Sequence, residues 1–177
     1  MVLQLEEILG TLGMPNAKFK VHLKSTNHYL KKGKDELEFL FTANKGGQFN
    51  ELKKAASGGE LSRIMLAIKF ILSKYMHLPT IMFDEIDSGV SGEISNKMAS
   101  IMQQMSKSMQ VFTITHIPQI AAKGDTHFKV FKEDVNNVTQ TQLKKLNPDE
   151  RIVEIAQMLG GVNISNSALA HAKQLLN

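Results

Sequence analysis

The order of apolar and polar residues predicts a chain that alternates between helices and strands. Apolar residues recur at mainly helical spacing over residues 1–12, and the pattern stops at Gly13, so a helix is expected to end there. Residues 18–24 alternate between polar or basic and apolar side chains, and 37–43 form a second run of strand type. With a polar turn at 31–35 between them, the two runs predict an antiparallel pair.

The middle of the chain has the pattern of a strand, a helix and a second strand. Before it, a helix is expected to begin at Ser57 and to continue through 61–75, where apolar residues recur at helical spacing. Short apolar runs at 80–83 and 111–115 have the length of strands, and the stretch 93–107 between them has a helical pattern. This succession favours a parallel βαβ unit whose strands are covered on both faces.

The last third predicts a hairpin and two closing helices. The hairpin pairs 128–132 with 138–146, and the helices cover 148–159 and 165–176. A length of 177 residues suits one compact α/β unit. Three methionines of the preceding helix are expected to pack in a core or an interface: Met98, Met102 and Met105.

Composition excludes several classes of protein. With 42% hydrophobic and 21% charged residues, the chain has the make-up of an ordinary globular protein. No apolar stretch approaches the roughly 20 residues of a membrane span, and the start does not resemble a secretory signal, so a cytoplasmic location without a membrane partner is expected. The absence of cysteine excludes disulfides, thiolate metal sites and a cysteine nucleophile.

The net charge of +4 leaves open whether the chain binds nucleic acid. Its basic residues gather toward the N-terminal side, where they could neutralise phosphates or simply form a solvated face. The lysines concerned are Lys18, Lys20, Lys24, Lys31, Lys32, Lys34, Lys45, Lys53 and Lys54.

Two segments carry candidate chemistry. Ser57, Gly58 and Gly59 stand at the predicted start of a helix, where backbone N–H groups and the helix dipole favour a phosphate. The strand at 80–83 runs into two adjacent carboxylates, Asp84 and Glu85, which suit Mg²⁺ and the activation of water. Because ligands gather at the carboxyl ends of parallel strands, His116 is expected at the same edge.

Other interpretations of these residues stay open. Ser57 also fits an N-cap followed by flexible glycines. No stretch of the sequence fits the phosphate-binding pattern G-x-x-x-x-G-K-[ST], so a complete ATP site is not expected from this chain alone. A serine hydrolase built on Ser91, Asp84 and His116 is disfavoured, because Gly92 directly follows Ser91 and the G-x-S-x-G pattern is missed.

Three segments together resemble one family. ASGGELSR at 56–63, PTIMFDEIDSGVSG at 79–92 and THIPQIAA at 115–122 are similar to the RecN family of bacterial DNA-repair ATPases, which is related to SMC and Rad50 proteins. The resemblance implies an α/β fold, the C-terminal half of an ABC-type P-loop NTPase head, with a mostly parallel sheet flanked by helices and added antiparallel strands. Residues 1–12 would end a returning coiled-coil arm, and 13–177 would form the C-terminal lobe, while the Walker A motif lies in an absent N-terminal half.

The resemblance also implies roles for individual residues. The signature residues would contact ATP bound to a second copy of the head: Ser57, Gly58, Gly59 and Glu60. Asp84 corresponds to the Walker B aspartate that holds Mg²⁺, and Glu85 to the catalytic glutamate. His116 corresponds to the switch histidine that reaches the γ-phosphate. Asp87 corresponds to the D-loop, which crosses between heads, although a simple helix or turn cap is the competing interpretation.

The implied function is an ATPase cycle in DNA double-strand-break repair by homologous recombination, at the nucleoid. ATP with Mg²⁺ would close two heads and hydrolysis would release them, so the implied partners are the N-terminal Walker A half, a second copy of the head as a homodimer, and DNA. Alternatives are another SMC-like or Rad50-like head, or a non-catalytic interaction or DNA-binding module. A transporter ATPase is disfavoured, because its signature usually ends in Gln where this chain has Glu60.

Overall fold

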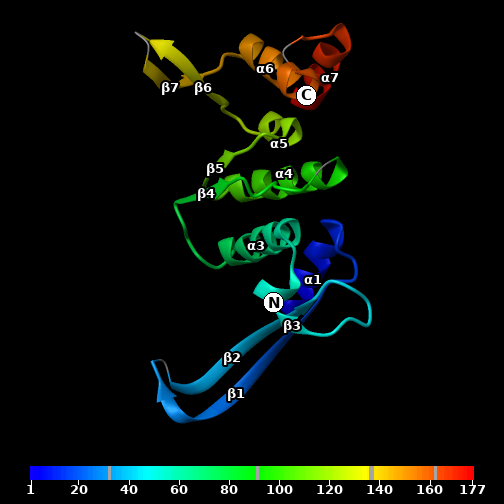
Figure 1. Cartoon of the computed structure of the whole chain (residues 1–177), viewed down its shortest axis with the longest axis vertical. Helices are drawn as coiled ribbons and strands as arrows, with labels where there is room; N and C mark the ends of the chain where they lie inside the picture. Colours follow the sequence, from blue (N-terminus) through cyan, green and yellow to red (C-terminus); the bar gives the residue numbers. More distant parts are fainter. Residues whose placement is uncertain (32, 91, 136–137, 162) are drawn as a thin grey trace. The chain divides into compact units, whose positions relative to one another are not determined.

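A computed structural model describes residues 1–31, 33–90, 92–135, 138–161 and 163–177 (Figure 1). The chain forms two compact units, Met1–Ile114 and Thr115–Asn177, where its length had suggested one. Each unit has its own helices and strands, and buried apolar residues occur in both. The expectation of a single compact unit is therefore wrong.

The first unit opens with a helix and an antiparallel hairpin. Helix α1 (Val2–Thr11) buries Leu5 and Leu9. Strands β1 (Lys18–Leu30) and β2 (Gly33–Thr42) pair antiparallel as predicted, and the two-residue strand β3 (Asn50–Glu51) extends the sheet beside β2. The strands are longer than the sequence pattern indicated, because pairing continues through residues that had been assigned to the turn.

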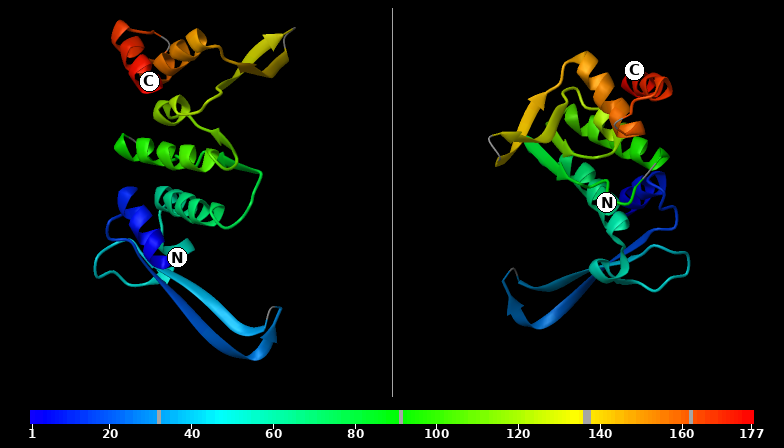
Figure 2. Two further views of the ribbon diagram at one scale, coloured as in Figure 1. Left: turned by 180° about the vertical axis from the view of Figure 1, so that it is seen from behind. Right: turned by 45° about the horizontal axis from the view of Figure 1, so that its top comes forward.

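Two helices follow the hairpin. The short helix α2 (Leu52–Ala55) had not been predicted, whereas α3 (Gly58–Ser73) begins directly after Ser57 as expected. Helix α3 buries four apolar residues and packs against α1 and against α4 (Glu93–Ser106), which is visible in both views of Figure 2. The start of α3 is thereby held in the middle of the first unit.

Strands β4 (Thr80–Asp84) and β5 (Gln110–Ile114) pair directly in parallel, and α4 connects them in sequence, which confirms the βαβ unit. One face of this pair packs on α4: Phe83 and Ile81 are buried, and Thr113 Oγ1 lies 3.4 Å from Met102 Sδ. The other face is bare, with Met82 62% and Phe112 42% exposed. The prediction that both faces are covered is wrong for this chain, because α4 covers one side only.

The methionines of α4 lie in the core of the first unit. Met98, Met102 and Met105 are 0%, 6% and 1% exposed. They recur at three- and four-residue spacing, so one face of α4 is apolar while the other carries residues such as Glu93 and Lys97. Core packing is confirmed for these residues.

The second unit contains a hairpin and three helices. Helix α5 (Pro118–Ala122) precedes the predicted hairpin of β6 (Phe128–Val135) and β7 (Val138–Lys145), and the closing helices are α6 (Pro148–Gly160) and α7 (Asn166–Leu176). The core joins α5, α6 and α7 through small and branched side chains. Its buried members are Ala122, Ile155, Ala156, Ala168 and Ala172.

The sheets differ from the expected mostly parallel arrangement. Among the described residues there are three separate sheets, and the pairing is parallel between β4 and β5 alone. The other strands come from hairpins, whose short connections dictate antiparallel pairing. In the described part of the chain, no helix combines the length and the apolar character needed to cross a membrane.

Candidate functional site

Helix α3 begins with a capping box formed by Ser57 and Glu60. Ser57 Oγ accepts a hydrogen bond from Glu60 N at 3.4 Å, and Glu60 Oε2 accepts from Ser57 N at 2.8 Å and from Ser57 Oγ at 2.7 Å. Donors at the helix start are thereby satisfied within the chain. The N-cap interpretation of Ser57 is correct as a description of the local structure.

The cap changes what Glu60 can do. Its carboxylate is held by the Ser57 backbone amide, and this hydrogen bond is the main cause that lowers the pKa of Glu60 below its ordinary value. In this structure the side chain accepts hydrogen bonds from Ser57. The predicted contact of Glu60 with nucleotide stays a prediction.

Gly58 and Gly59 occupy different surroundings within the first turn of α3. A Cβ at Gly58 would meet no atom within 4 Å, and the residue is exposed, so the space beside it is open. A Cβ at Gly59 would lie 3.3 Å from Ser88 O and 3.6 Å from Gly89 O. The structure therefore brings the start of α3 against the loop after β4, a contact between segments about thirty residues apart in sequence.

Asp84 and Glu85 end strand β4 at the carboxyl edge of the parallel pair. Both are exposed, and Asp84 alternates onto the bare face of the pair together with Met82. Glu85 has φ 45°, and no other non-glycine residue in the described ranges has a positive φ. Such a conformation costs about 1–2 kcal/mol for an L-residue and is often retained at functional positions.

Hydrogen bonds hold the Glu85 backbone in this conformation. Glu85 N donates to Ile114 O at 3.1 Å, which ties the residue to the end of β5. Glu85 O accepts from Ser88 N at 3.2 Å and from Ser88 Oγ at 2.9 Å. The carboxylate thus projects from a fixed turn between β4 and the loop that contacts α3.

Asp87 lies inside this loop and is 2% exposed. Its carbonyl oxygen accepts a turn hydrogen bond from Val90 N at 3.2 Å. The turn is consistent with the competing interpretation of Asp87 as a turn residue, and its role in a D-loop between heads stays a prediction. Ser88 and Gly89, the next residues of the loop, are exposed.

Arg63 belongs to the site although the sequence analysis did not select it. Its Nε donates to Gly59 O at 3.2 Å and its Nη1 donates to Leu12 O at 3.2 Å, so it joins the first turn of α3 to the end of α1. Arg63 is the last residue of the ASGGELSR segment at 56–63, so the residue itself was within a recognised motif. Its partner Leu12 lies 51 residues away, which no local pattern reveals.

His116 and Ser91 stand apart from this group. His116 is exposed and follows the end of β5 by two residues, but it belongs to the second unit, so its approach to Asp84 and Glu85 stays a prediction. Thr115 Oγ1 accepts from Ile117 N at 2.9 Å next to it. Ser91, disfavoured above as a nucleophile, lies outside the described residues.

The residues present fit a magnesium nucleotide only as part of a shared site. Within the described ranges, no three His, Cys, Asp or Glu side chains gather into a metal cluster. Mg²⁺ is typically bound by one or two carboxylates together with phosphate oxygens and water, which an exposed Asp84 at a strand end can satisfy. The exposed first turn of α3 at Gly58 likewise suits a phosphate brought by another chain segment.

Comparison with protein families identifies the class of this chain. The family described as RecF/RecN/SMC N terminal domain matches residues 18–139. The chain belongs to this family. Proteins called DNA repair protein RecN are similar over most of the chain: that of Rickettsia typhi is 40% identical over 173 residues, covering 98% of this chain and 31% of its own length. That of Bacillus subtilis is 44% identical over 144 residues, covering 81% of this chain and 25% of its own length.

Solved structures support the fold. The Smc head domain of Pyrococcus yayanosii, with a coiled coil and joint, matches with a TM-score of 0.65 and 19% identity over 88% of this chain and 28% of its own. The Smc head domain of Pyrococcus furiosus, bound to the C-terminal domain of ScpA, matches with a TM-score of 0.60 and 23% identity over 86% of this chain and 36% of its own. The chain thus has the fold of SMC-type heads.

These similarities show the family and the fold of this chain. This chain spans about a third of the length of the curated relatives it matches. The family description names an N-terminal domain. Which half of a head this chain forms is therefore a matter for the proposal below.

Proposed function

We propose that this chain is the signature and Walker B half of an ABC-type ATPase head that acts in DNA double-strand-break repair. The observation that carries the proposal is the contact of Gly59 with the loop at Ser88, directly after Asp84 and Glu85. The signature and the carboxylates would serve nucleotides at neighbouring interfaces, and this contact would link them. A phosphate loop, absent from the sequence, would come from another polypeptide segment.

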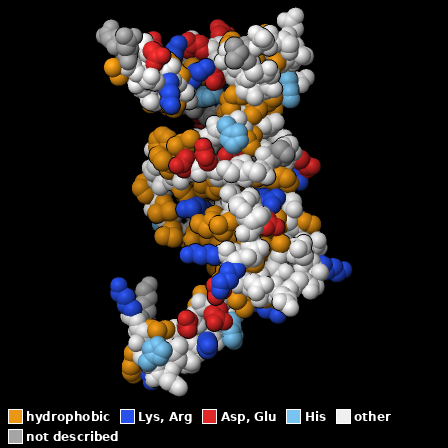
Figure 3. Space-filling model, in the orientation of Figure 1, with side chains coloured by type: hydrophobic (Ala, Val, Ile, Leu, Met, Phe, Trp, Pro, Cys, Tyr) orange, Lys and Arg blue, Asp and Glu red, His pale blue; other side chains and the backbone are white. Residues whose placement is uncertain are grey.

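The bare face of β4 and β5 supports a missing half. Met82, Phe112 and Ile114 are 62%, 42% and 52% exposed on one side of the pair, and hydrophobic side chains gather over this region in Figure 3. An apolar sheet face of this kind favours burial. Because Asp84 alternates onto the same face, a Walker A half docked there would bring its phosphate loop near the Asp84 carboxylate.

Residue roles follow from this arrangement. ATP with Mg²⁺ would supply the hydrolysable phosphoryl group and its charge neutralisation, with Asp84 holding the metal directly or through water. Glu85 would orient and deprotonate water, and His116 would act as the switch histidine at the γ-phosphate. Ser57 with the amides of Gly58 and Gly59 would donate to the nucleotide of a second head. Ser57 Oγ must then turn away from Glu60, to which it donates in this structure.

The wider function belongs to the same proposal. The RecN relatives are named DNA repair proteins, so DNA is the expected partner and a second copy of the head the expected dimer partner. Residues 1–12 would end a coiled-coil arm, and Arg63 would join that arm to the signature turn. The location would be the cytoplasm, at the nucleoid.

The test is ATPase activity of this chain, alone and mixed with a separately produced Walker A half. We expect activity in the mixture alone, and a loss of about 10²- to 10⁴-fold for Glu85→Gln because the general base is removed, with nucleotide binding retained. Met82→Asp should also prevent the two halves from co-eluting, whereas Val138→Asp, an equally exposed apolar strand residue in β7, should not.

Two outcomes would contradict the proposal. A complex of the halves that forms but stays inactive would favour the alternative of a non-catalytic docking module. Full activity in the Glu85→Gln mixture would show that the base lies elsewhere.

A further inference from the structure

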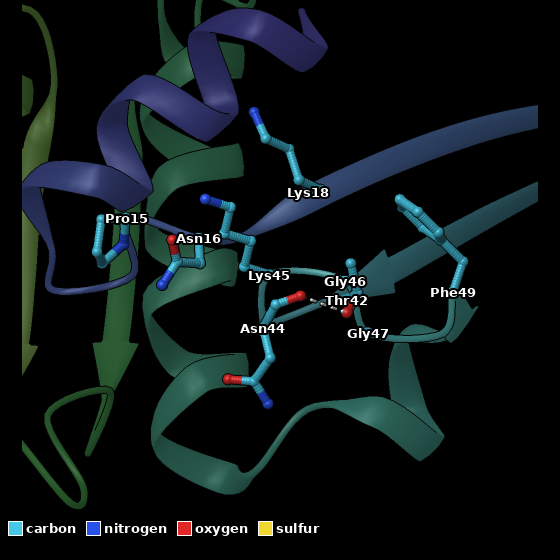
Figure 4. A pocket seen from close by; sticks show the side chains of 9 residues that line it. All are labelled: Pro15, Asn16, Lys18, Thr42, Asn44, Lys45, Gly46, Gly47 and Phe49. Carbon is cyan, nitrogen blue, oxygen red and sulfur yellow. Dashed lines mark hydrogen bonds between the residues drawn. The ribbon is translucent and has the colours of Figure 1, made fainter.

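A groove of about 310 Å³ lies in the first unit at the root of the β1–β2 hairpin (Figure 4). The segment after α1 contributes Asn16 and Lys18 to its lining. The loop after β2 contributes Asn44 and Lys45, and Phe49 follows shortly after. The figure shows Asn16 and Lys45 on one side of the groove and Phe49 on the other.

The loop that lines the groove has a defined turn. Gly47 N donates to Asn44 O at 3.0 Å, and Gly46 at the third position of the turn has φ +75°, as a type II turn requires. Thr42 Oγ1 donates to Asn44 O at 3.3 Å. A Cβ at Gly47 would lie 2.4 Å from Thr42 Oγ1, so the chain passes close by at this point. The groove is preorganised.

Hydrogen-bonding groups at the groove are left for a ligand. Among the described residues, the side chains of Asn16, Asn44 and Lys45 have no hydrogen-bonding or ionic partner. The backbone amides of Lys45 and Gly46 likewise donate no hydrogen bond to any described residue. None of the described residues that line the groove carries a carboxylate. These groups form a cradle of donors with an unpaired positive charge.

Neighbouring lysines differ in how far their charge is neutralised. Lys18 Nζ lies 2.6 Å from Glu6 Oε2 and so contributes little net charge. Lys20 Nζ lies 4.1 Å from the centroid of the Phe49 ring, next to the groove. Farther along the hairpin, basic and acidic side chains are mixed (Figure 3), as in the pair of His22 with Glu38. Lys32 lies outside the described residues.

We propose that the groove binds a phosphate of the DNA backbone. The unpaired Lys45 ammonium supplies charge neutralisation, the free amides and carboxamides supply hydrogen bonds, and Lys20 extends the positive site beside Phe49. Phosphate contacts of this kind dominate DNA affinity and do not depend on sequence. The choice of DNA as the source of the phosphate rests on the proposed function.

The test is fluorescence anisotropy of a labelled DNA duplex titrated with this chain over a series of salt concentrations. We expect Lys45→Gln to weaken binding about 3- to 10-fold and to reduce the salt slope by about 1, as for one lost phosphate contact. Lys53→Gln is the matched control, since it removes the same charge from an exposed lysine outside the groove. This control should change affinity less than about 2-fold.

Separate outcomes overturn the inference. Equal effects of Lys45→Gln and Lys53→Gln would show that DNA binding depends on the overall positive charge and not on the groove. If the wild-type chain bound no DNA, the proposed site would be rejected. Inorganic phosphate that displaces the duplex better than chloride of equal ionic strength would assign the groove to a small phosphate ligand. Failure here with ATPase activity intact in the mixed halves would reject the groove and leave the proposed function standing.

Discussion

Helices α3 and α6 begin with the same capping device in the two units. Ser57 and Glu60 form the box of α3, and Asn147 and Glu150 form that of α6, where Glu150 N donates to Asn147 Oδ1 at 2.9 Å and Asn147 N donates to Glu150 Oε2 at 3.0 Å. An arginine in the following turns reaches the end of an earlier helix in both cases. The difference lies in the two residues inside the box.

The α6 box encloses Pro148 and Asp149, whereas the α3 box encloses Gly58 and Gly59. Proline fits the first helical position and aspartate complements the helix dipole, so the first turn of α6 is built for stability. Glycine disfavours helix by about 1 kcal/mol relative to alanine. The α3 start gives up that stability and leaves an exposed residue without a side chain in its first turn, Gly58, which allows a phosphate to approach.

The largest expected effect comes from giving α3 the acidic residue of α6. Gly58→Asp fits sterically, because the position is open, and a carboxylate in the first turn favours the helix by about 0.3–1 kcal/mol. We expect ATPase activity of the mixed halves to fall about 100-fold, since the carboxylate repels the phosphate, a loss of the size seen when one charge-stabilising donor is removed. Urea denaturation should show unchanged or higher stability.

The control for this exchange is Asp149→Gly in α6. It should lower stability by up to about 1 kcal/mol through the lost dipole interaction and the added backbone entropy, while activity stays at the wild-type level. Normal turnover by Gly58→Asp would mean that the open turn does not face nucleotide.

The same two helices show what could be predicted from sequence. The start of α3 at Ser57 was predictable because a serine, a glutamate three residues on and apolar spacing are local signals. The nucleotide contact of Glu60 stays a prediction, because the same S-x-x-E spacing is also a capping signature and Glu60 caps α3 in this structure. Arg63 was missed because its bond to Leu12 joins distant segments.

Burial was predicted less well than the elements themselves. The apolar run of β4 shows that its residues favour burial on both faces, but it does not say what covers them, and α4 covers only the side of Phe83. Asp87 is buried although it is charged, which no local pattern indicated. The hydrophobic periodicity of the sequence also does not indicate where the first unit ends and the second begins.

The second largest effect should come from the two arginines. Arg151 Nη2 donates to Ala122 O at 2.8 Å, to Ala121 O at 3.4 Å and closely to Gly124 O, whereas Arg63 reaches the single distant carbonyl of Leu12. Arg151→Met should destabilise by about 2–3 kcal/mol and Arg63→Met by about 1–2 kcal/mol, because partly buried carbonyls lose charged donors. Urea denaturation with fluorescence and circular dichroism would measure both.

Activity separates the two arginine variants. Arg63→Met should reduce ATPase activity beyond its share of unfolded chain, because Gly59 loses its contact, whereas Arg151→Met should lose activity only in proportion to unfolding. If the two variants lost the same ATPase activity for each kcal/mol of lost stability, the role of Arg63 would be purely structural.

Smaller effects are expected from the capping side chains. Ser57→Ala and Asn147→Ala each remove the acceptor of a helix N–H and should cost about 1 kcal/mol. Only Ser57→Ala should also impair hydrolysis, since its hydroxyl is proposed to turn toward the nucleotide. Matching thermal denaturation curves of the two variants with different ATPase activities would support the comparison; a fully active Ser57→Ala would limit the serine to its cap.

The smallest effect is the pH dependence of the two boxes. The Ser57 amide lowers the pKa of Glu60, and Lys144 is the main cause that lowers the pKa of Glu150. Carboxyls with lowered pKa values bind fewer protons when folded, so each stabilises its helix at neutral pH and loses this contribution as the pH falls below about 4.3, the ordinary value for glutamate. Glu60→Gln and Glu150→Gln should therefore flatten the decline of stability toward pH 3.

Salt should distinguish the pH dependence of the two boxes. Lys144 Nζ lies 2.5 Å from Glu150 Oε1 in an exposed ion pair, which salt screens, whereas the backbone hydrogen bond to Glu60 is not screened. If 0.5 M salt removed both pH dependences equally, the Glu60 cap would be held by charge pairing with Arg63 instead of by the Ser57 amide.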